Sequence, residues 1–467
     1  MTQYEYAKTI AVAEPTDVLI VGSGPSGLGA AIASARAGVS TRLVERFGFL
    51  GGNLTAGLVH PCMTSFSLDG STQLVRGIFD EFIRRLEGKG AAVHPSHTMS
   101  GTPYSGFMKF GHEAVTPFDH EAAKLESMDM CEEAGVDVLL HSFAVDTVVD
   151  QGAVKGVIVG NKSGLTLLPA EVVVDCTGDG DVVANGGGKF EFGREEDGLT
   201  QPMSLFFRIA DADDDRIEEY KRNHPEEHFP YQHIVEQAQE EGSYDLPRRG
   251  VQLFKTMQPG VWSINTTRVL GMDGTDVADL THAEKTARHQ IPELMRFFHD
   301  RLPGLENARV LDSAPTIGVR ESRRISGNYT LTLADLVEGR HFEDVVAVAG
   351  YPVDIHSPSS SAGPFDEDEI PSTANVYEIP YGALVPHSLD GVIVAGRCIS
   401  ATHEALAAIR VMPPAFAIGQ AAGEAAARSI HEQVSPAHIN VRALQKRLVS
   451  TGAYLGEAYA SETVEVS

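Results

Sequence analysis

The sequence predicts an α/β protein: a Rossmann-like nucleotide-binding domain, built from a parallel sheet plus a small antiparallel β-meander, that carries an inserted mixed α+β domain. Three observations predict this fold. A β-α-β unit with a glycine-rich turn begins at Asp17, a β-meander runs into an apolar strand in mid-chain, and a strand followed by an alanine-rich helix lies near the C-terminus. Pieces this far apart in sequence form one domain when other segments are inserted between them.

The N-terminal unit has the pattern of a buried strand, a helix and a second strand. Residues 17–22 are expected to form a strand, and the continuous apolar run within it, VLIV, is typical of a parallel strand buried on both faces. A helix of small residues is expected over residues 25–37 and ends at Gly38, where the next strand, STRLVER (residues 40–46), approaches. These elements predict a parallel β-α-β unit.

The middle of the chain continues this domain. Residues 118–140 predict a helix that stops at Gly135, followed by a strand. Residues 143–178 alternate between β-type runs and turn signals, which indicates an antiparallel meander that feeds into a buried strand at Val172–Cys176.

The pattern becomes longer and more polar between about Gly188 and Pro380, as expected for an inserted second domain that includes an acidic Pro/Ser loop at residues 357–375. A parallel-type strand (GVIVAGRCIS, residues 391–400) and an alanine-rich helix (residues 413–430) then complete the first domain. The expected division is residues 1–60, 115–187 and 381–435 for the nucleotide-binding domain, 61–114 and 188–380 for the substrate domain, and 436–467 for a C-terminal helix and tail.

Composition excludes several classes of partner. The 467 residues contain 37 Lys and Arg against 64 Asp and Glu, a net charge of −27, which repels nucleic acid and anionic lipid surfaces. The four cysteines lack the spacing of zinc, iron–sulfur or redox-pair ligands, so we expect no metal site and reduced thiols in a cytoplasmic protein. No apolar run has the length of a membrane span, and the N-terminal residues lack the pattern of a secretion signal.

The glycine-rich turn is a G-x-G-x-x-G motif formed by Gly22, Gly24 and Gly27. Gly22 permits the tight turn, Gly24 lets the backbone approach a pyrophosphate, and Gly27 lets the helix pack on the strand. Glu45 ends the second strand, where a carboxylate accepts ribose hydroxyls and disfavours a 2′-phosphate. The motif alone leaves NAD, NADP and FAD open, as well as a glycine-rich turn in an unrelated α/β protein.

Later segments favour a long cofactor. Gly51 and Gly52 predict an extended segment beside such a cofactor, with a surface loop as the alternative. Thr177 and Gly178 follow the mid-chain strand, at the edge where open α/β sheets bind ligands, although a plain Asp-Gly turn explains the same residues.

The C-terminal strand and helix point to a flavin. Gly396 and Arg397 end the strand, and Arg397 is placed to reach a phosphate. The helix that starts near Pro413 is expected to present free N–H groups of Ala415 and Phe416, and its positive end favours a reduced flavin.

Taken together, these motifs resemble the FAD-dependent oxidoreductase family within the glutathione-reductase-type flavoproteins, which is related in fold to the flavoprotein subunits of fumarate reductase and succinate dehydrogenase. The resemblance rests on residues 18–38, 173–184, 317–332, 342–356, 377–386 and 392–423. It implies FAD as cofactor, with Val145 touching the adenine through its backbone and Ala415–Ala417 capping the flavin. The cofactor-binding residues it implies are Gly22, Ser23, Gly24, Gly27, Glu45, Arg46, Gly51, Gly52, Asn53, Val145, Thr177, Gly178, Gly396, Arg397, Ala415, Phe416 and Ala417. The sequence departs from cluster-bearing relatives because it lacks their cysteines. It also lacks an evident cysteine pair beside the flavin, which argues against disulfide reductase chemistry.

Three residues are the candidates for catalysis. Arg320 belongs to the run RESRRISG, whose arginines could clamp a carboxylate or the flavin, or form a structural ion-paired cluster, which fits Arg323 and Arg324 at least as well. His356 ends YPVDIH and is placed to take a hydroxyl proton, the alternative being a histidine of the domain core. Arg410 precedes the flavin-capping helix and is expected to face the substrate.

The function expected first is hydride transfer between a small polar organic substrate and flavin N5, as in a dehydrogenase or oxidase. The sequence holds no second G-x-G-x-x-G motif, so reduced flavin is expected to pass electrons to O2 or a diffusible carrier. Two alternatives stay open: a monooxygenase that uses NAD(P)H and O2, and a non-catalytic flavoprotein that binds or escorts a partner. A homo-oligomer also stays open.

Overall fold

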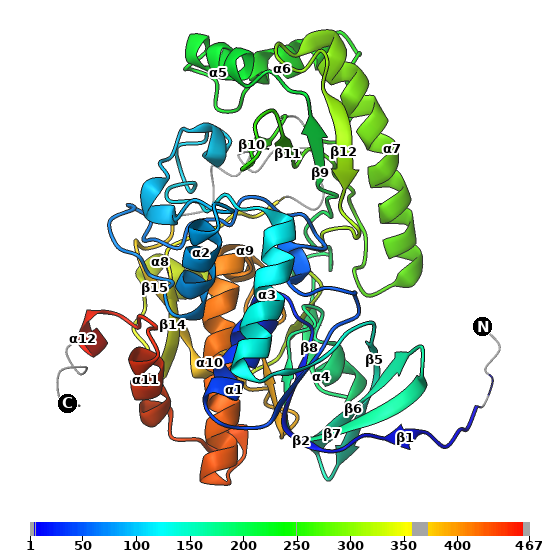
Figure 1. The fold of residues 1–467 in the computed structure, drawn as a ribbon, viewed down its shortest axis with the longest axis vertical. Coiled ribbons are helices and arrows are strands. Elements are labelled where there is room, and N and C mark those ends of the chain that lie inside the picture. Colours follow the sequence, from blue (N-terminus) through cyan, green and yellow to red (C-terminus); the bar gives the residue numbers. More distant parts are fainter. Residues whose placement is uncertain (1–3, 5, 249, 357–371, 461–467) are drawn as a thin grey trace.

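A computed structural model describes residues 4, 6–248, 250–356 and 372–460. Its main feature is an eight-stranded sheet (Figure 1), confirming the expected α/β class. The strands are β1 (Ala11–Val12), β2 (Thr16–Val21), β3 (Thr41–Val44), β4 (Asp137–Leu139), β5 (Phe143–Asp150), β6 (Ala153–Asn161), β7 (Gly164–Asp175) and β16 (Val392–Val394).

The long strand β7 joins the parallel and antiparallel parts of this sheet. Its second half pairs in parallel with β2, where Val18 faces Val172, and with β16, where Val392 faces Val173. Its first half pairs antiparallel with β6, and β5 follows at the edge. The buried strand expected at Val172–Cys176 is therefore the end of the third meander strand, because the backbone of β7 runs without interruption from the exposed meander into the buried parallel sheet.

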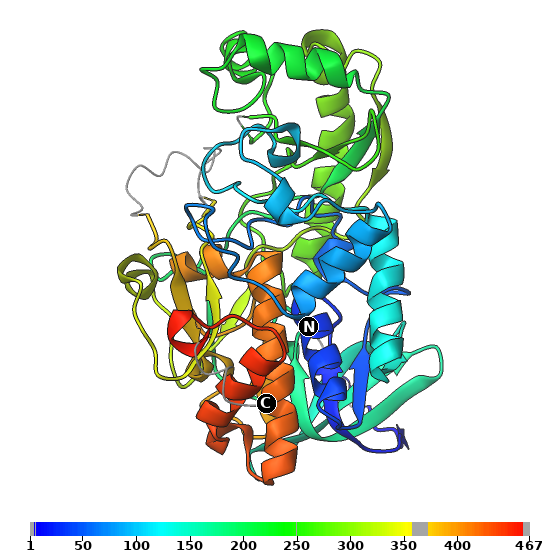
Figure 2. The same cartoon turned by 60° about the vertical axis from the view of Figure 1, so that its left-hand side comes forward.

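Two helices that pack on this sheet also pack against each other, so closely that their backbones are in contact. They are α1 (Pro25–Arg36) and α10 (Met412–Glu432), which lie side by side in Figures 1 and 2. A Cβ built on Gly419 would lie 2.0 Å from the Ser26 carbonyl oxygen, and one on Gly423 would lie 2.2 Å from the Ala30 carbonyl oxygen. The contact sets the first turn of α10 beside the glycine-rich turn that begins α1.

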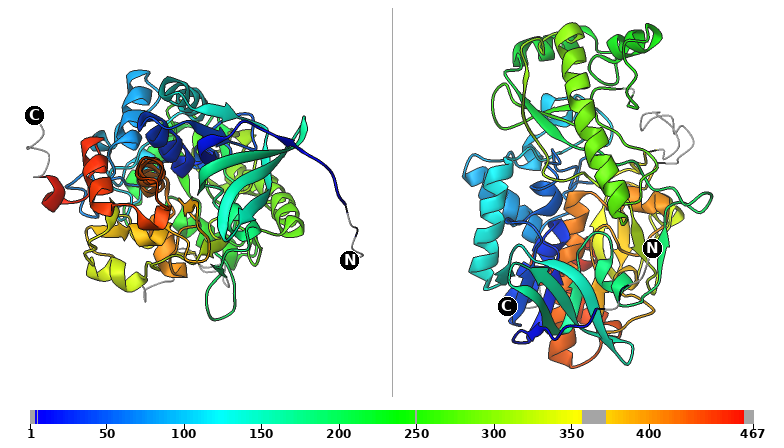
Figure 3. Two further views of the ribbon diagram at one scale, coloured as in Figure 1. Left: turned by 90° about the horizontal axis from the view of Figure 1, so that it is seen from below. Right: turned by 90° about the vertical axis from the view of Figure 1, so that its right-hand side faces the viewer.

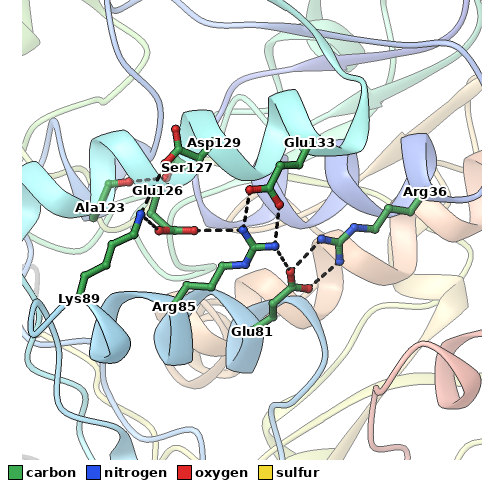
Figure 4. A network of polar contacts seen from close by, with 9 residues as sticks. All are labelled: Arg36, Glu81, Arg85, Lys89, Ala123, Glu126, Ser127, Asp129 and Glu133. Atoms are coloured by element: carbon green, nitrogen blue, oxygen red, sulfur yellow. Dashed lines mark hydrogen bonds and ion pairs between the residues drawn. The ribbon is translucent and has the colours of Figure 1, made fainter.

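A network of ion pairs holds two further helices against α1. These are α2 (Ile78–Gly88) and α3 (His120–Ala134), and α3 ends at Gly135 as expected. Arg85 of α2 lies 2.7 Å from Glu133 and 2.8 Å from Glu81, and Glu81 in turn lies 2.6 Å from Arg36 of α1 (Figure 4). The buried Glu126 of α3 accepts from both Arg85 and Lys89 near the C-terminal end of α2, so its charge is compensated where it is desolvated.

Shorter elements complete this half of the molecule. Strands β8 and β13 form one pair and β14 and β15 another, and α11 lies outside α10 (Figure 2). Their bounds are α4 (Asp181–Asn185), β8 (Phe190–Phe192), β13 (Arg323–Ile325), α8 (Leu333–Glu338), β14 (Val345–Ala349), β15 (Tyr377–Pro380), α9 (His403–Ile409), α11 (Val441–Ser450) and α12 (Glu457–Ala460).

A second antiparallel sheet with its own helices forms the other end of the molecule (Figures 1 and 3). Its order is β10-β11-β9-β12, and the fully buried Trp262 belongs to its hydrophobic cluster. The elements are β9 (Phe207–Ala210), α5 (Asp214–Asn223), α6 (Gln232–Glu240), β10 (Leu253–Lys255), β11 (Trp262–Ile264), α7 (Val277–Arg301) and β12 (Arg309–Ser313).

Two hydrophobic clusters bear on the domain boundaries. One contains the main sheet with α1 and α10, and the other contains residues from Met203 to Ile317 together with Leu58 and Phe107. Residues 325–349 pack in the first cluster, so we propose that they belong with the nucleotide-binding domain and that the inserted domain ends before them. Residues 357–371 of the expected acidic loop lie outside the described residues.

Within the described ranges, no single helix has the length and apolar character to cross a bilayer, while α9 and α10 together pass that test by length and composition, with a 93° bend between them. Most of α10 is buried inside the fold. The described part of the chain contains no cluster of three or more His, Cys, Asp or Glu side chains arranged to hold a metal ion.

Candidate functional site

A groove of about 1140 Å³ runs along the edge where the parallel strands β2, β3, β7 and β16 end. Pieces far apart in sequence form its walls, because parallel strands present their carboxyl ends at one edge of a sheet. Of the residues expected to bind the cofactor, the groove is lined by Gly22, Ser23, Gly24, Glu45, Arg46, Gly52, Asn53, Thr177, Gly178, Gly396, Arg397 and Ala415.

The three glycines of the first turn serve different purposes. Gly22 has φ +95°, and a Cβ there would lie 2.5 Å from the Cys176 carbonyl oxygen. A Cβ on Gly27 would lie 1.8 Å from the Gly22 carbonyl oxygen, so Gly27 supports the turn without lining the groove. Gly24 has φ −61°, which any residue can adopt, and its Cβ would meet no atom within 4 Å. The space that Gly24 leaves therefore opens into the groove, as a ligand's close approach requires.

Glu45 holds the wall of the groove beside this turn. Its Oε2 accepts hydrogen bonds from the Ser23 backbone N–H at 3.0 Å and from the Ser23 hydroxyl at 2.6 Å, and its Oε1 accepts from the Phe47 N–H at 2.9 Å. A carboxylate offers about four acceptor positions, so a further donor from a ligand can be accommodated. Arg46, which follows, is exposed and lies over the Phe47 ring.

The expectation of an extended segment at Gly51 and Gly52 is wrong. Both have positive φ, and they lead into a short 3-10 helix, η1 (Gly52–Leu54). The reason is packing against the first turn: the Gly51 N–H donates to the Ser23 carbonyl oxygen at 3.0 Å, and a Cβ on Gly52 would lie 2.7 Å from the Gly24 Cα. Gly51 thus lies behind the groove, while Gly52 lines it.

The loop after β7 is organised by a residue that sequence reasoning missed. Asp175 is fully buried, and its two carboxylate oxygens accept from the Thr177 N–H and hydroxyl and from the N–H groups of Val182 and Val183 at the start of α4. Burial raises the pKa of this carboxyl. The signal in the sequence was an acidic residue inside an otherwise apolar strand, VVVD.

Arg397 connects this loop to the segment that precedes β13. Its guanidinium donates to Asp179 at 2.7 Å and to the Ser322 hydroxyl at 2.8 Å, and its side chain lines the groove. Arg397 is therefore already partnered by a carboxylate, which limits how far it can serve a phosphate as expected from the sequence.

The first turn of α10 also differs from expectation. The helix begins at Met412, so the N–H of Ala415 donates to the Val411 carbonyl oxygen at 3.1 Å and is not free. Pro413 and Pro414 have no N–H, which leaves Met412 as the donor that this turn can offer to a ligand. The positive end of the helix nevertheless lies at the groove, because Met412 and Ala415 both line it.

Three other expected cofactor residues do not line the groove. Phe143 and Ala144 line it where a backbone contact of Val145 was expected, and Val145 lies exposed next to them on the edge strand β5. Phe416 packs in the core against Phe79 and Phe82. Ala417 lies on a half-buried face of α10 away from the lining residues.

A second cavity of about 710 Å³ adjoins the groove and brings together all three catalytic candidates. Arg320, His356 and Arg410 line it, although they come from separate segments. The two spaces share lining residues, namely Asn53, Val319, Arg397, Arg410 and Met412.

Asp354 connects two of these side chains. Its Oδ1 lies 3.5 Å from His356 Nε2, and its backbone carbonyl oxygen accepts from Arg410 Nη2 at 2.8 Å. Burial, followed by the charge of Arg320 and neighbouring arginines, holds the pKa of His356 well below its usual value. His356 is therefore a neutral imidazole at the wall of the cavity.

The other arginines of the RESRRISG run have structural partners. Arg323 lies 2.8 Å from Asp181, and Arg324 donates to Glu321 and to the Ala401 and Gly193 carbonyl oxygens. Arg323 and Arg324 therefore form the structural, ion-paired cluster that the sequence offered as an alternative. Of the arginines in this run, Arg320 is the one that lines the cavity.

Comparison with known proteins identifies the class. The sequence pattern of the FAD dependent oxidoreductase family matches residues 17–448. The chain therefore belongs to the FAD dependent oxidoreductase family: it is an enzyme, and FAD is its cofactor. Membership of a family of oxidoreductases leaves the non-catalytic alternative without support.

Individual relatives are more distant. The chain is 31% identical over 180 residues to the thiamine thiazole synthase of Aeropyrum pernix, a match over 36% of this chain and 56% of the relative. Among solved structures, a geranylgeranyl bacteriochlorophyll reductase-like protein from Thermoplasma acidophilum has 14% identity and a TM-score of 0.44, over 90% of this chain and 80% of the other. The p-nitrophenol 4-monooxygenase of Pseudomonas putida DLL-E4 has 13% identity and a TM-score of 0.47, over 91% of this chain and 82% of the other.

Proposed function

We propose that this enzyme is a dehydrogenase or oxidase that transfers a hydride between a small polar organic substrate in the second cavity and N5 of FAD in the groove. The observation that carries the proposal is the convergence of Arg320, His356 and Arg410 on one cavity that shares walls with the groove. When bound, FAD supplies the two-electron acceptor or donor for a substrate carbon.

The residues of the groove fit such a cofactor. Gly22 and Gly24 bring bare backbone to the pyrophosphate at the start of α1, and Glu45 lies where ribose hydroxyls are bound in this type of fold. Met412 and Ala415 place the positive end of α10 at the junction with the second cavity, which is where the flavin end belongs.

Replacing Gly24 by Val tests this placement. The φ of Gly24 accepts a β-branched residue and its Cβ meets no protein atom, so we expect the apoprotein to keep its stability. The side chain would occupy the space beside the pyrophosphate, and FAD affinity should fall at least tenfold, measured by flavin fluorescence titration. Unchanged FAD affinity in a folded variant would show that the cofactor lies elsewhere.

In this proposal, His356 moves the proton that accompanies the hydride. Oxidation of a C–H next to a hydroxyl or amine breaks the C–H bond with its electron pair and releases the O–H or N–H proton. The neutral imidazole of His356 accepts that proton, and Asp354 stabilises the imidazolium that results. Arg320 and Arg410 orient the polar substrate.

We expect His356→Gln to slow flavin reduction about 100-fold or more and to leave FAD content unchanged. The second-order rate constant of reduction in the wild type should not fall between pH 7.5 and 6.5, since the low pKa keeps His356 a base through that range. The measurement is anaerobic stopped-flow loss of the visible flavin absorbance, with a panel of sugars, hydroxy acids and amines. His289→Gln, on the exposed face of α7, is the control.

Two results would contradict the proposal. Reduction that requires NADPH together with an aromatic substrate would make the enzyme a monooxygenase. Loss of FAD from His356→Gln would place this residue in cofactor binding and not in proton transfer.

A further inference from the structure

Among the described residues, more arginines than carboxylates line the second cavity. Arg320, Arg397 and Arg410 line it, and Asp354 is the one carboxylate that lines it among the described residues. Arg397 is paired with Asp179, and Asp354 lies 3.4 Å from Arg410. No carboxylate of the described residues lies within ion-pair distance of Arg320.

The contacts of Arg320 are with neutral groups. It is only 9% exposed, and its Nη1 donates to the Pro202 carbonyl oxygen at 2.5 Å and to the Ser204 hydroxyl at 2.8 Å. These two bonds fix one edge of the guanidinium and hold the side chain at the cavity wall. An arginine positioned in this way presents its remaining donors to whatever enters the cavity.

Two further buried arginines add to the positive potential around the cavity. Arg248 and Arg268 are each 2% exposed, and Arg248 Nη2 is buried without a hydrogen-bond partner among the described residues. Burial, followed by the charges of Arg410, Arg248 and Arg268, lowers the pKa of Arg320 well below its usual value, whereas the charge of Asp354 acts to raise it. These side chains therefore repel one another in a desolvated site.

Buried charge of one sign is costly unless an opposite charge accompanies it. The rest of the protein is strongly acidic, with a net charge of −27, so the positive site is a local exception. An oxyanion is the ligand that relieves this repulsion, because its oxygens accept from several guanidinium groups at once. The apolar part of the wall, formed by Val59, Met63 and Phe206, leaves room for an organic body.

We propose that the second cavity selects organic anions, and that Arg320 is the residue that binds the carboxylate or phosphate group of the substrate. This inference rests on the proposed function for the role of the cavity. Arg320 lines the second cavity but not the groove, whereas Arg410 lines both.

The test uses FAD-loaded enzyme and matched acids and amides. Acetate and benzoate are titrated against acetamide and benzamide, which have nearly the same shapes without the charge, and inorganic phosphate forms a separate arm. Binding is measured by calorimetry and by the shift of the visible flavin spectrum. We expect an acid or phosphate to bind at least tenfold more tightly than the amides, and the two arms distinguish a carboxylate from a phosphate ester.

Arg320→Met should weaken anion binding at least tenfold with FAD content unchanged. Arg301→Met, which removes an arginine from a distant ion pair with Glu241 on the surface, should bind the anion like the wild type. Arg320→Lys keeps the charge without the planar fork and should retain part of the affinity, which covers the case in which the Met variant fails to fold.

The inference would be overturned if neither the acids nor phosphate bound more tightly than the amides, or if anion binding were unchanged in Arg320→Met. Failure of the proposed function gives a different result: the anion binds and its binding depends on Arg320, but no sugar, hydroxy acid or amine of the panel reduces the flavin.

Discussion

Gly419→Ala is expected to destabilise the fold by about 3 kcal/mol or more and to reduce FAD content. Alanine is ordinarily the better helix former by about 1 kcal/mol, so the direction of the effect comes from packing alone. The new Cβ would lie 2.0 Å from the Ser26 carbonyl oxygen, an atom of the α1 backbone that cannot rotate away. To relieve this clash, α10 must move away from α1, and this movement displaces the N-terminal end of α10 at the groove.

The control is Gly88→Ala at the end of α2, where a Cβ meets no atom within 4 Å. This variant should be as stable as the wild type or slightly more stable. Urea unfolding gives the two free energies, and the flavin-to-protein absorbance ratio gives the FAD content. Equal stability of the two variants would mean that α1 and α10 can separate without cost, contrary to the packing described here.

The second large effect is a loss of stability in mild acid from two buried histidines. His60 and His120 are buried against Phe118, with ring centroids 5.5 Å apart. His60 Nε2 contacts the Lys255 carbonyl oxygen and His120 Nδ1 contacts the Leu54 carbonyl oxygen, and the other ring nitrogen of each is buried without a partner among the described residues. Burial lowers the pKa of His60 to about 3 and that of His120 to about 4.

In the pH range between these lowered pKa values and the ordinary histidine pKa of about 6.5, the unfolded chain binds more protons than the folded chain. Stability is therefore complete above about pH 6.5 and is lost as the pH falls below it. At pH 5 each histidine lowers the free energy of unfolding by about 2 kcal/mol relative to pH 7.5, so the pair lowers it by about 4 kcal/mol.

The measurement is the free energy of unfolding in urea at pH 7.5 and pH 5, compared between the wild type and His120→Gln. The difference between the two pH values should be smaller in the variant by about 2 kcal/mol, whatever the substitution costs at pH 7.5. His289→Gln, exposed on α7, should keep the wild-type difference. An unchanged pH dependence in His120→Gln would show that this histidine is accessible to protons in the folded state.

Local pattern alone was sufficient for the elements of the nucleotide-binding half. The apolar run of β2, the glycines of the first turn and the stop at Gly135 specify their structures through backbone conformation and burial within a few residues of themselves. The convergence of strand ends on one edge also followed from the sequence, because parallel strands share that edge.

Features that depend on contacts between distant residues were not predictable in the same way. The extended segment expected at Gly51 is a tight turn because it packs on Ser23, and Ala415 lost its expected free N–H because α10 starts one residue before its prolines. The structuring role of Asp175 involves residues only seven and eight positions away, but it depends on α4 folding back onto the end of β7.

The sequence by itself determined the fold class and the residue types at the groove, since these depend on local pattern and spacing, and its resemblance to the FAD-dependent oxidoreductases implied the cofactor. Only the tertiary structure decided that Arg320, His356 and Arg410 share one cavity, while Arg323 and Arg324 are bound to acids and carbonyl groups elsewhere. The physical reason is that distant residues contribute to the burial and pairing of these side chains: Arg320 donates to Pro202 and Ser204, and Arg323 pairs with Asp181, each more than a hundred positions away in the chain.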